Sequence, residues 1–242
     1  MGDICGLAEP LLNIIHEDDR LLVLNKPSGL VCHPTKGDET SSLVGRVRLH
    51  MGPNYHLVNR LDRETSGLVL IAKEDTAARA LRRAWESRTV TKTYLAIVHG
   101  HPIEETQTIS APLGRDLDSH VAIKDCVLPG GFISETTFKV LRRFERDARP
   151  FALLEVQPHS GRKHQIRIHL AHIGHPIVGD KIYGGDENLY LDFIADRLTE
   201  TQRAQLILPF HALHAQKLEF PLDRQTQTYE APPEPWFKNF LE

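Results

Sequence analysis

Residues 56–68 have the sequence His56-Leu57-Val58-Asn59-Arg60-Leu61-Asp62-Arg63-Glu64-Thr65-Ser66-Gly67-Leu68. The apolar residues of 56–62 and 67–72 predict two strands joined by a polar turn. A carboxylate at such a turn is held by a rigid scaffold. Arg60 and Arg63 beside Asp62 favour the ionised form that a nucleophile or base needs. Asp62 is therefore a candidate catalytic residue, and a turn-forming aspartate is the alternative that composition alone favours as much.

The rest of the chain predicts an α+β fold. Short apolar runs predict further strands over 21–24, 94–98, 138–141, 151–156 and 213–220. Apolar residues at spacing four predict a helix over 76–87, and a second helix is expected over 162–173, capped by Ser160 and closed by Gly174. Because strands outnumber helices and many are adjacent in sequence, we expect a mixed, mostly antiparallel central sheet with flanking helices.

Length and composition bound the class of protein. The chain has 242 residues, 40% of them hydrophobic, which excludes intrinsic disorder. It contains no long linker, so we expect a single domain over 1–242. No apolar run approaches a membrane span, and the start lacks the features of a secretory signal. The widely spaced Cys5, Cys32 and Cys126 indicate reduced thiols, and we expect a cytoplasmic protein.

The charge distribution is uneven although the net charge is only −3. Residues 76–99 carry five Lys or Arg against one acid, residues 142–169 carry seven against three, and residues 180–242 carry six against eleven. Two basic stretches are compatible with one face for a polyanion. A solvated helix face is the alternative, and charge alone favours that alternative.

Several common chemistries have no sequence signature here. The chain has no Walker P-loop, no Gly-x-Gly-x-x-Gly before a helix, no Cys-x-x-Cys pair and no His-Glu-x-x-His helix. One cluster of histidines raises metal binding as an alternative: His159, His164, His169, His172 and His175. The neighbouring cations oppose a metal ion, so we expect no metal and no nucleotide cofactor.

Long motifs in a fixed order give the chain a family resemblance. Residues 56–68 resemble the catalytic motif of the RluA-type RNA pseudouridine synthases, and residues 160–170 (Ser-Gly-Arg-Lys-His-Gln-Ile-Arg-Ile-His-Leu) resemble that family's later motif. Similar segments lie at 25–31, 92–96, 111–116, 172–180, 183–184 and 213–215, so the likeness covers about residues 12–235. Asn59 departs from the pattern, because the family usually has His there.

The resemblance implies isomerisation of uridine to pseudouridine within RNA, without a cofactor. It implies that Asp62 is the essential carboxylate, that Arg167 pairs with it, and that Tyr94 stacks on the flipped base and helps remove the last proton. Arg60 corresponds to the arginine inserted into the RNA stack, and Ile168 and Leu170 are candidates for the pocket wall. The remaining RNA-binding candidates are Arg63, Arg162, Lys163 and His164.

The expected substrate is a stem-loop of ribosomal or transfer RNA. The likeness begins near residue 12, so we expect no N-terminal accessory RNA-binding domain and a catalytic domain that recognises RNA as a monomer, through the basic stretches 79–92 and 142–167. Two alternatives belong to other classes: a non-catalytic RNA-binding module and a nucleoside hydrolase that releases free uracil.

Overall fold

The computed structural model describes residues 11–34, 39–223 and 225–242. Most described strands belong to one sheet: β1 (Ile14–Glu17), β2 (Leu21–Lys26), β3 (His56–Leu57), β4 (Ser66–Ala72), β5 (Thr91–His99), β6 (Thr106–Ser110), β9 (Glu135–Arg146), β10 (Arg149–Pro158), β11 (Leu213–Leu222) and β12 (Gln225–Glu230). A separate ribbon pairs β7 (Leu113–Arg115) with β8 (Asp125–Val127). The helices are α1 (Leu43–Met51), α2 (Asp75–Glu86), α3 (Gln165–His172), α4 (Asn188–Ile194), α5 (Glu200–Leu206) and α6 (Pro235–Leu241), with a 3-10 turn at Glu39–Ser41.

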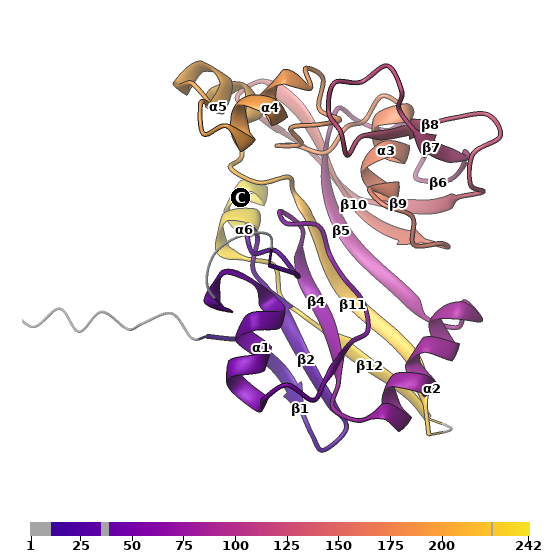
Figure 1. Ribbon diagram of the computed structural model, residues 1–242. Coiled ribbons are helices and arrows are strands. Elements are labelled where there is room, and N and C mark those ends of the chain that lie inside the picture. Colours follow the sequence, from indigo (N-terminus) through magenta and orange to yellow (C-terminus); the bar gives the residue numbers. More distant parts are fainter. Residues whose placement is uncertain (1–10, 35–38, 224) are drawn as a thin grey trace, which may run out of the picture.

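The large sheet passes through the whole molecule (Figure 1). Its strand order is β1-β2-β4-β11-β5-β10-β9-β6, with β3 beside β4 and β12 beside β11. Described neighbours are antiparallel except β4 and β11, which are parallel. This mixed, mostly antiparallel sheet with flanking helices confirms the predicted fold class.

The half of the sheet around β2 and β4 is buried on both faces. Side chains alternate along a strand, so Leu21 and Val23 pack on one face with α2, whereas Leu22 and Leu24 pack on the other face with α1. Every residue of β2 and β4 is buried. Two apolar faces explain why these strands have near-continuous apolar sequences instead of alternating ones.

The other half of the sheet packs β5, β9 and β10 against α3 and α6. Phe151 and Phe240 meet edge to face at 5.2 Å in this core, and Leu170 of α3 is fully buried in it. Helices α3, α4 and α5 gather at this end of the molecule, while α1 and α2 lie at the opposite end (Figure 1).

The two halves meet where β4 runs beside β11. Gly67 has a φ of +110°, and a Cβ added there would lie 2.3 Å from the carbonyl oxygen of Ala215. Only glycine permits this approach. Gly67 therefore fixes the junction between the halves directly after the segment that carries Asp62.

Most predicted elements are confirmed, and two are shorter than predicted. The strand expected over 56–62 is confirmed as β3 only at His56–Leu57. The Val58 N–H still donates to the Leu70 carbonyl at 2.9 Å, and beyond it the Asn59 side chain replaces the backbone ladder: Leu70 N–H donates to its Oδ1 at 2.8 Å and its Nδ2 donates to the Leu68 carbonyl at 3.1 Å. The helix expected from 162 begins at Gln165, because His164 has a φ of +55°. Ser160 therefore does not cap α3; its hydroxyl donates to Gln165 Oε1 instead.

The domain and thiol predictions remain predictions. Cys32 and Cys126 are unpaired, and Cys5 lies outside the described residues. In the described part of the chain, no helix is both long and apolar enough to span a bilayer.

Candidate active site

Asp62 lies on an irregular turn that is fastened on several sides. The Arg63 carbonyl accepts hydrogen bonds from the backbone N–H of Gly29 at 2.9 Å and from Lys26 Nζ at 3.1 Å. The Lys26 side chain is fully buried and also donates to the carbonyls of Pro27 and Leu30. These bonds hold the backbone next to Asp62 while its side chain stays one-third exposed to the pocket.

The residues after Asp62 fasten the turn to β11 and the segment before it. Thr65 Oγ1 lies 2.7 Å from His211 Nε2, and Ser66 Oγ lies 2.9 Å from His214 Nδ1, with all four residues buried. Together with Gly67, the Thr-Ser-Gly segment therefore serves to attach the turn to the opposite half of the sheet.

Arg167 of α3 is shared between two carboxylates. Its Nη1 donates to Asp62 Oδ2 at 3.1 Å, and its Nε and Nη2 donate to the two oxygens of Asp180 at 2.6 and 2.9 Å. The contact expected between Arg167 and Asp62 is thus present, over 105 positions of sequence. Asp180, which is fully buried, also accepts from the backbone N–H groups of Ile182 and Tyr183.

This arrangement keeps Asp62 ionised. Burial alone would raise the pKa of Asp62, but His164, which is charged only in acid, the Arg167 cation and the hydrogen bond from Arg167 bring that pKa below its ordinary value. Burial, followed by the nearby Arg167, lowers the pKa of His164 to about 4, so His164 is neutral at pH 7 and Arg167 is the cation that acts there. Asp62 is a carboxylate at neutral pH.

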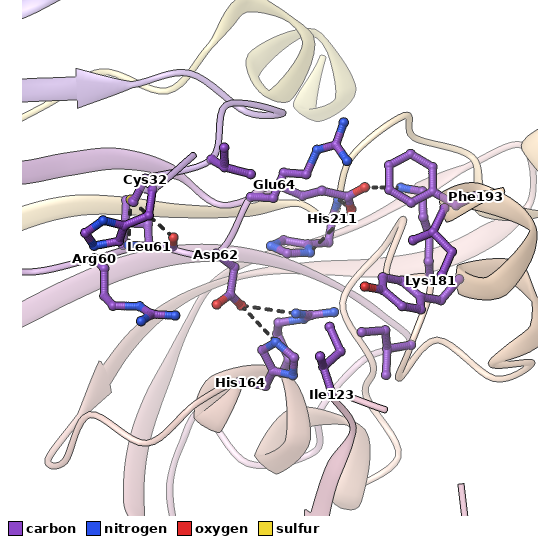
Figure 2. Close-up of a pocket in the computed structure, with 17 residues that line it drawn as sticks. Cys32, Arg60, Leu61, Asp62, Glu64, Ile123, His164, Lys181, Phe193 and His211 are labelled. Carbon is purple, nitrogen blue, oxygen red and sulfur yellow. Dashed lines mark hydrogen bonds and ion pairs between the residues drawn. The ribbon is translucent and has the colours of Figure 1, made fainter. Parts of the chain in front are cut away.

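His164 lies in the site and not on the open surface. Its side chain is only 6% exposed, its Nε2 is 3.8 Å from Asp62 Oδ2, and its Nδ1 is 2.9 Å from the Tyr183 hydroxyl. Figure 2 shows the ring directed at Asp62. If His164 contacts RNA, as predicted, the contact must therefore be with a nucleotide that enters this pocket.

Tyr94 of β5 is partly buried and lies near Asp62, but it is not among the residues that line the pocket. Burial and then the negative charge of Asp62 raise the pKa of Tyr94 above its ordinary value. The phenol therefore keeps its proton at neutral pH.

A pocket of about 380 Å³ opens at Asp62 (Figure 2). That volume is within the range of small-molecule sites. Its lining comes from several distant segments: Val31, Cys32, His33, Arg60, Leu61, Asp62, Arg63, Glu64, Ile123, His164, Arg167, Lys181, Ile182, Tyr190, Phe193, Ile194 and His211. The structure thus brings Asp62, Arg60, Arg63, His164 and Arg167 together, as the sequence analysis expected.

Ile168 and Leu170 do not line this pocket. Both are buried, and Leu170 packs in the core beneath α3. Arg167 lines the pocket, whereas Ile168, the next residue, points about 100° away around the helix. Leu170 lies nearly one turn beyond Arg167, where it packs in the core. The apolar wall is formed instead by residues such as Ile123, Ile182 and Phe193.

Sequence reasoning missed a buried polar group at the pocket. Lys181 Nζ donates to Glu64 Oε1 at 2.7 Å, and Glu64 Oε2 lies 3.6 Å from His211 Nδ1 (Figure 2). Glu64 lies within the motif of residues 56–68, and Lys181 follows directly after the similar segment 172–180; these positions were the available signal. The aromatic wall of α4 had no such signal: Phe193 lies over the Lys181 ammonium at 4.7 Å and the Arg63 guanidinium at 5.4 Å.

The predicted surface cations have different surroundings. Arg60, Arg63, Arg162 and Lys163 are exposed. The Arg162 guanidinium lies 4.7 Å from the ring of Phe132, and Lys163 pairs with Asp125 at 3.0 Å.

Part of the second basic stretch serves the fold. Arg142 and Arg146 donate to the carbonyls of Leu241 and Asn239 at the carboxyl end of α6. These two arginines therefore stabilise the end of α6, because a helix end has carbonyls that need donors. That residues 142–167 form one RNA-binding face stays a prediction.

The histidine cluster does not converge. His169 is fully buried, and its ring nitrogens lie 2.8 Å from Thr136 Oγ1 and 3.0 Å from the Ala111 carbonyl. Both nitrogens are thus engaged, and His172 is exposed on the same helix. Within residues 11–34, 39–223 and 225–242 no three His, Cys, Asp or Glu side chains gather as metal ligands would.

A large, mostly antiparallel sheet with one Arg-paired aspartate in its pocket is the arrangement that the resemblance implied. Residues 20–172 match the family model described as RNA pseudouridylate synthase, and the chain belongs to this family. Its RluA-type character is confirmed by relatives such as the ribosomal large subunit pseudouridine synthase D of Pseudomonas aeruginosa, which is 37% identical over 86% of this chain and 63% of its own length.

Other relatives support the same assignment. The uncharacterized RNA pseudouridine synthases YlyB and YhcT of Bacillus subtilis are 41% and 38% identical over 74% of this chain. The matched part spans 60% and 59% of the length of these two relatives. Among solved structures, human RNA pseudouridylate synthase domain containing 1 is similar with a TM-score of 0.74 and 27% identity, over 93% of this chain and 86% of that one.

Proposed function

We propose that this chain isomerises uridine to pseudouridine at a specific position in structured RNA, with Asp62 as the essential carboxylate. The observation that carries the proposal is the Arg167–Asp62 contact of 3.1 Å inside the pocket of an RNA pseudouridylate synthase family member. The reaction breaks the bond between C1′ of the ribose and N1 of uracil, turns the base, and joins C1′ to C5.

Asp62 can act in either of two ways. It can attack C1′ and expel the base, or it can remove a proton from the sugar so that the base leaves by elimination. Both need an ionised carboxylate at the moment of substrate binding, and the lowered pKa of Asp62 supplies it. Asp180 holds the Arg167 guanidinium so that one of its nitrogens faces Asp62.

The target uridine must leave its stack to reach Asp62, because the glycosidic bond is inaccessible inside a helix. Unstacking costs about a few kcal/mol. We propose that Arg60, which is exposed at the pocket, enters the space that the base leaves. We also propose that Tyr94, which lies near Asp62 but outside the pocket lining, becomes a shelf for the flipped base once RNA is bound. The raised pKa of Tyr94 favours this role over that of a base for the last proton.

The proposed RNA is a compact stem-loop of ribosomal or transfer RNA. Several relatives are named for the large ribosomal subunit, which favours a ribosomal hairpin. Arg60 and Arg63 line the pocket and Arg162 and Lys163 are exposed beside His164, which gives cations near the site for phosphates. A flexible loop is the part of an RNA from which a uridine is extruded at least cost.

The test is pseudouridine mapping of RNA from cells with and without this gene, followed by reaction of the purified protein with the identified hairpin and with intact large-subunit RNA at two salt concentrations. We expect one or few sites, modification of the hairpin, and binding that weakens steeply with salt despite the net charge of −3. Free uracil in place of pseudouridine would indicate a nucleoside hydrolase, and binding without either product would indicate an RNA-binding module.

The proposal includes a single catalytic domain that acts as a monomer in the cytoplasm. Reduced thiols in Cys32 and Cys126 support this compartment. Light scattering with and without the hairpin would test the assembly state, for which we expect one protein chain per RNA.

A further inference from the structure

His164 presents an unused hydrogen-bonding atom to the substrate pocket. The residue precedes α3 with a φ of +55°, and this backbone turn brings its ring to the wall beside Asp62. Nδ1 contacts the Tyr183 hydroxyl, whereas Nε2 has no hydrogen-bond partner among the described residues. Figure 2 shows the ring facing the Asp62 carboxylate.

The contacts of Tyr183 fix which ring nitrogen carries the proton. The Tyr183 oxygen accepts from the Asp125 backbone N–H at 3.3 Å, so its own proton must point elsewhere. His164 Nδ1, at 2.9 Å, is the only other hydrogen-bond partner of that hydroxyl in the described part of the chain. Burial raises the pKa of Tyr183, so the hydroxyl keeps its proton. Because its oxygen already accepts from Asp125, we infer that the hydroxyl donates to Nδ1. The proton of the neutral imidazole therefore lies on Nε2.

This Nε2–H group is positioned but unsatisfied. Its distance of 3.8 Å from Asp62 Oδ2 is too long for a hydrogen bond. A substrate oxygen placed beside the Asp62 carboxylate would accept a hydrogen bond from this Nε2–H group. Because the ring is neutral at pH 7, it offers a donor without competing with Arg167 for the charge of Asp62.

We propose that His164 is a catalytic residue whose Nε2–H donates a hydrogen bond to O2 of the target uracil while the glycosidic bond breaks. The inference rests on the proposed function. When the C1′–N1 bond breaks, its electron pair goes to N1 and is shared with O2, the carbonyl oxygen nearest to that bond. A donor aimed at this oxygen stabilises the developing charge, as neutral donors do in oxyanion sites.

The step transfers no proton. Nε2 keeps its proton throughout, the electron pair remains on the uracil until C5 bonds to C1′, and the C5 proton leaves last to a base or to solvent. His164 thereby lowers the barrier to bond breaking at the leaving base while Asp62 acts on the sugar.

The experiment combines protein variants with a modified hairpin that carries 2-thiouridine at the target, because sulfur is a weak hydrogen-bond acceptor. His164→Asn tolerates a positive φ but does not reach the Nε2 position, and His164→Phe keeps the ring volume without a donor. On the natural hairpin we expect both to slow single-turnover formation of pseudouridine by about 100-fold, with RNA affinity little changed. His164→Gln, whose amide nitrogen reaches the Nε2 position, restores part of the rate.

The decisive readout is the sulfur effect, which is the factor by which 2-thiouridine at the target slows each protein relative to the natural hairpin. The unmodified protein and the control His172→Gln, a change on the exposed part of α3, should both be slowed by 2-thiouridine. The Asn and Phe variants should show no further slowing. A full sulfur effect in both variants overturns the role of His164, whereas no pseudouridine from the unmodified protein on the natural hairpin overturns the proposed function itself. Melting curves of each variant separate loss of rate from loss of fold.

Discussion

Arg167 and Asp180 form a bidentate ion pair in the interior, with nitrogen–oxygen distances of 2.6 and 2.9 Å. The pair orients the guanidinium so that its remaining nitrogen, Nη1, meets Asp62. Asp180, which has no access to solvent, thus positions the Arg167 guanidinium that pairs with the partly exposed Asp62. Asp180 does not itself line the pocket, so its role is exerted through Arg167.

Asp180→Asn should destabilise the fold and slow the reaction. Replacing one partner of a buried pair leaves an incompletely paired charge on Arg167, at a cost of about 3 kcal/mol. Urea unfolding measures the loss, and single-turnover kinetics measure the rate. Unchanged stability together with an unchanged rate would contradict the positioning role.

Arg167→Ala should slow turnover far more than it weakens RNA binding. Without its cation, the Asp62 carboxyl has a higher pKa, because burial then acts unopposed by Arg167. The acid limb of the pH–rate profile should therefore move to higher pH. Equal losses of rate and affinity with an unmoved profile would show that Arg167 only contacts phosphate.

Asp62→Asn should abolish pseudouridine formation with the fold and RNA affinity retained. The amide is of similar size but is neither a nucleophile nor a base at this position. The loss should reach many orders of magnitude, as expected when a covalent or base catalyst is removed. Mass spectrometry of the hairpin gives the rate, and a remaining rate above a small fraction of the original would exclude Asp62 as the essential group.

Asn59→Ala should cost about 1–3 kcal/mol of stability and lower the rate. It leaves the Leu70 N–H and the Leu68 carbonyl of a buried strand without their partner. Asn59→Asp is the matched control, since it keeps the acceptor for Leu70 but removes the donor for Leu68. For the Asp variant we expect an intermediate rate in single-turnover kinetics and an intermediate melting temperature. Full activity of the Ala variant would show that the turn needs no such support.

Stability should fall as the pH is lowered from about 6.5 to 4. Burial lowers the pKa of His164 to about 4 and of His211 to about 3, while an unfolded histidine titrates near 6.5. In this window the unfolded chain binds more protons, so each histidine lowers the free energy of unfolding by up to about 1.4 kcal/mol per pH unit. His211→Gln should reduce the pH dependence of the free energy of unfolding by up to about 1.4 kcal/mol per pH unit, measured by urea unfolding at several pH values. An unchanged slope would mean that His211 is protonated in the fold.

Activity should survive treatment with EDTA and need no added nucleotide. The sequence lacks the usual metal and nucleotide motifs, and His169 has both ring nitrogens engaged by Thr136 and Ala111. Pseudouridine formation after chelation, with and without added Zn²⁺, gives the answer. Activity that is lost on chelation and restored by the metal would assign the histidine cluster a role in coordination.

Local sequence determined the central strands and α2, and it singled out Asp62 as the proposed reacting group. The apolar runs of β2, β4, β5, β10 and β11 and the amphipathic pattern of α2 sufficed to predict their positions, because burial and side-chain alternation are encoded within each segment. The motif around Asp62 and the motif containing Arg167 identified the family before any geometry was known.

The tertiary structure alone decided the environment of that group. The ion pair between Lys181 and Glu64, the αL turn that brings His164 to Asp62, and the wall supplied by Phe193 depend on segments that meet only when the halves of the sheet join at Gly67 and Ala215. Pattern in a sequence reports which side chains are buried, but not which distant side chain each one meets. Charge and hydrogen bonding act over a few ångströms, so the protonation and direction of each site residue follow from its neighbours in space.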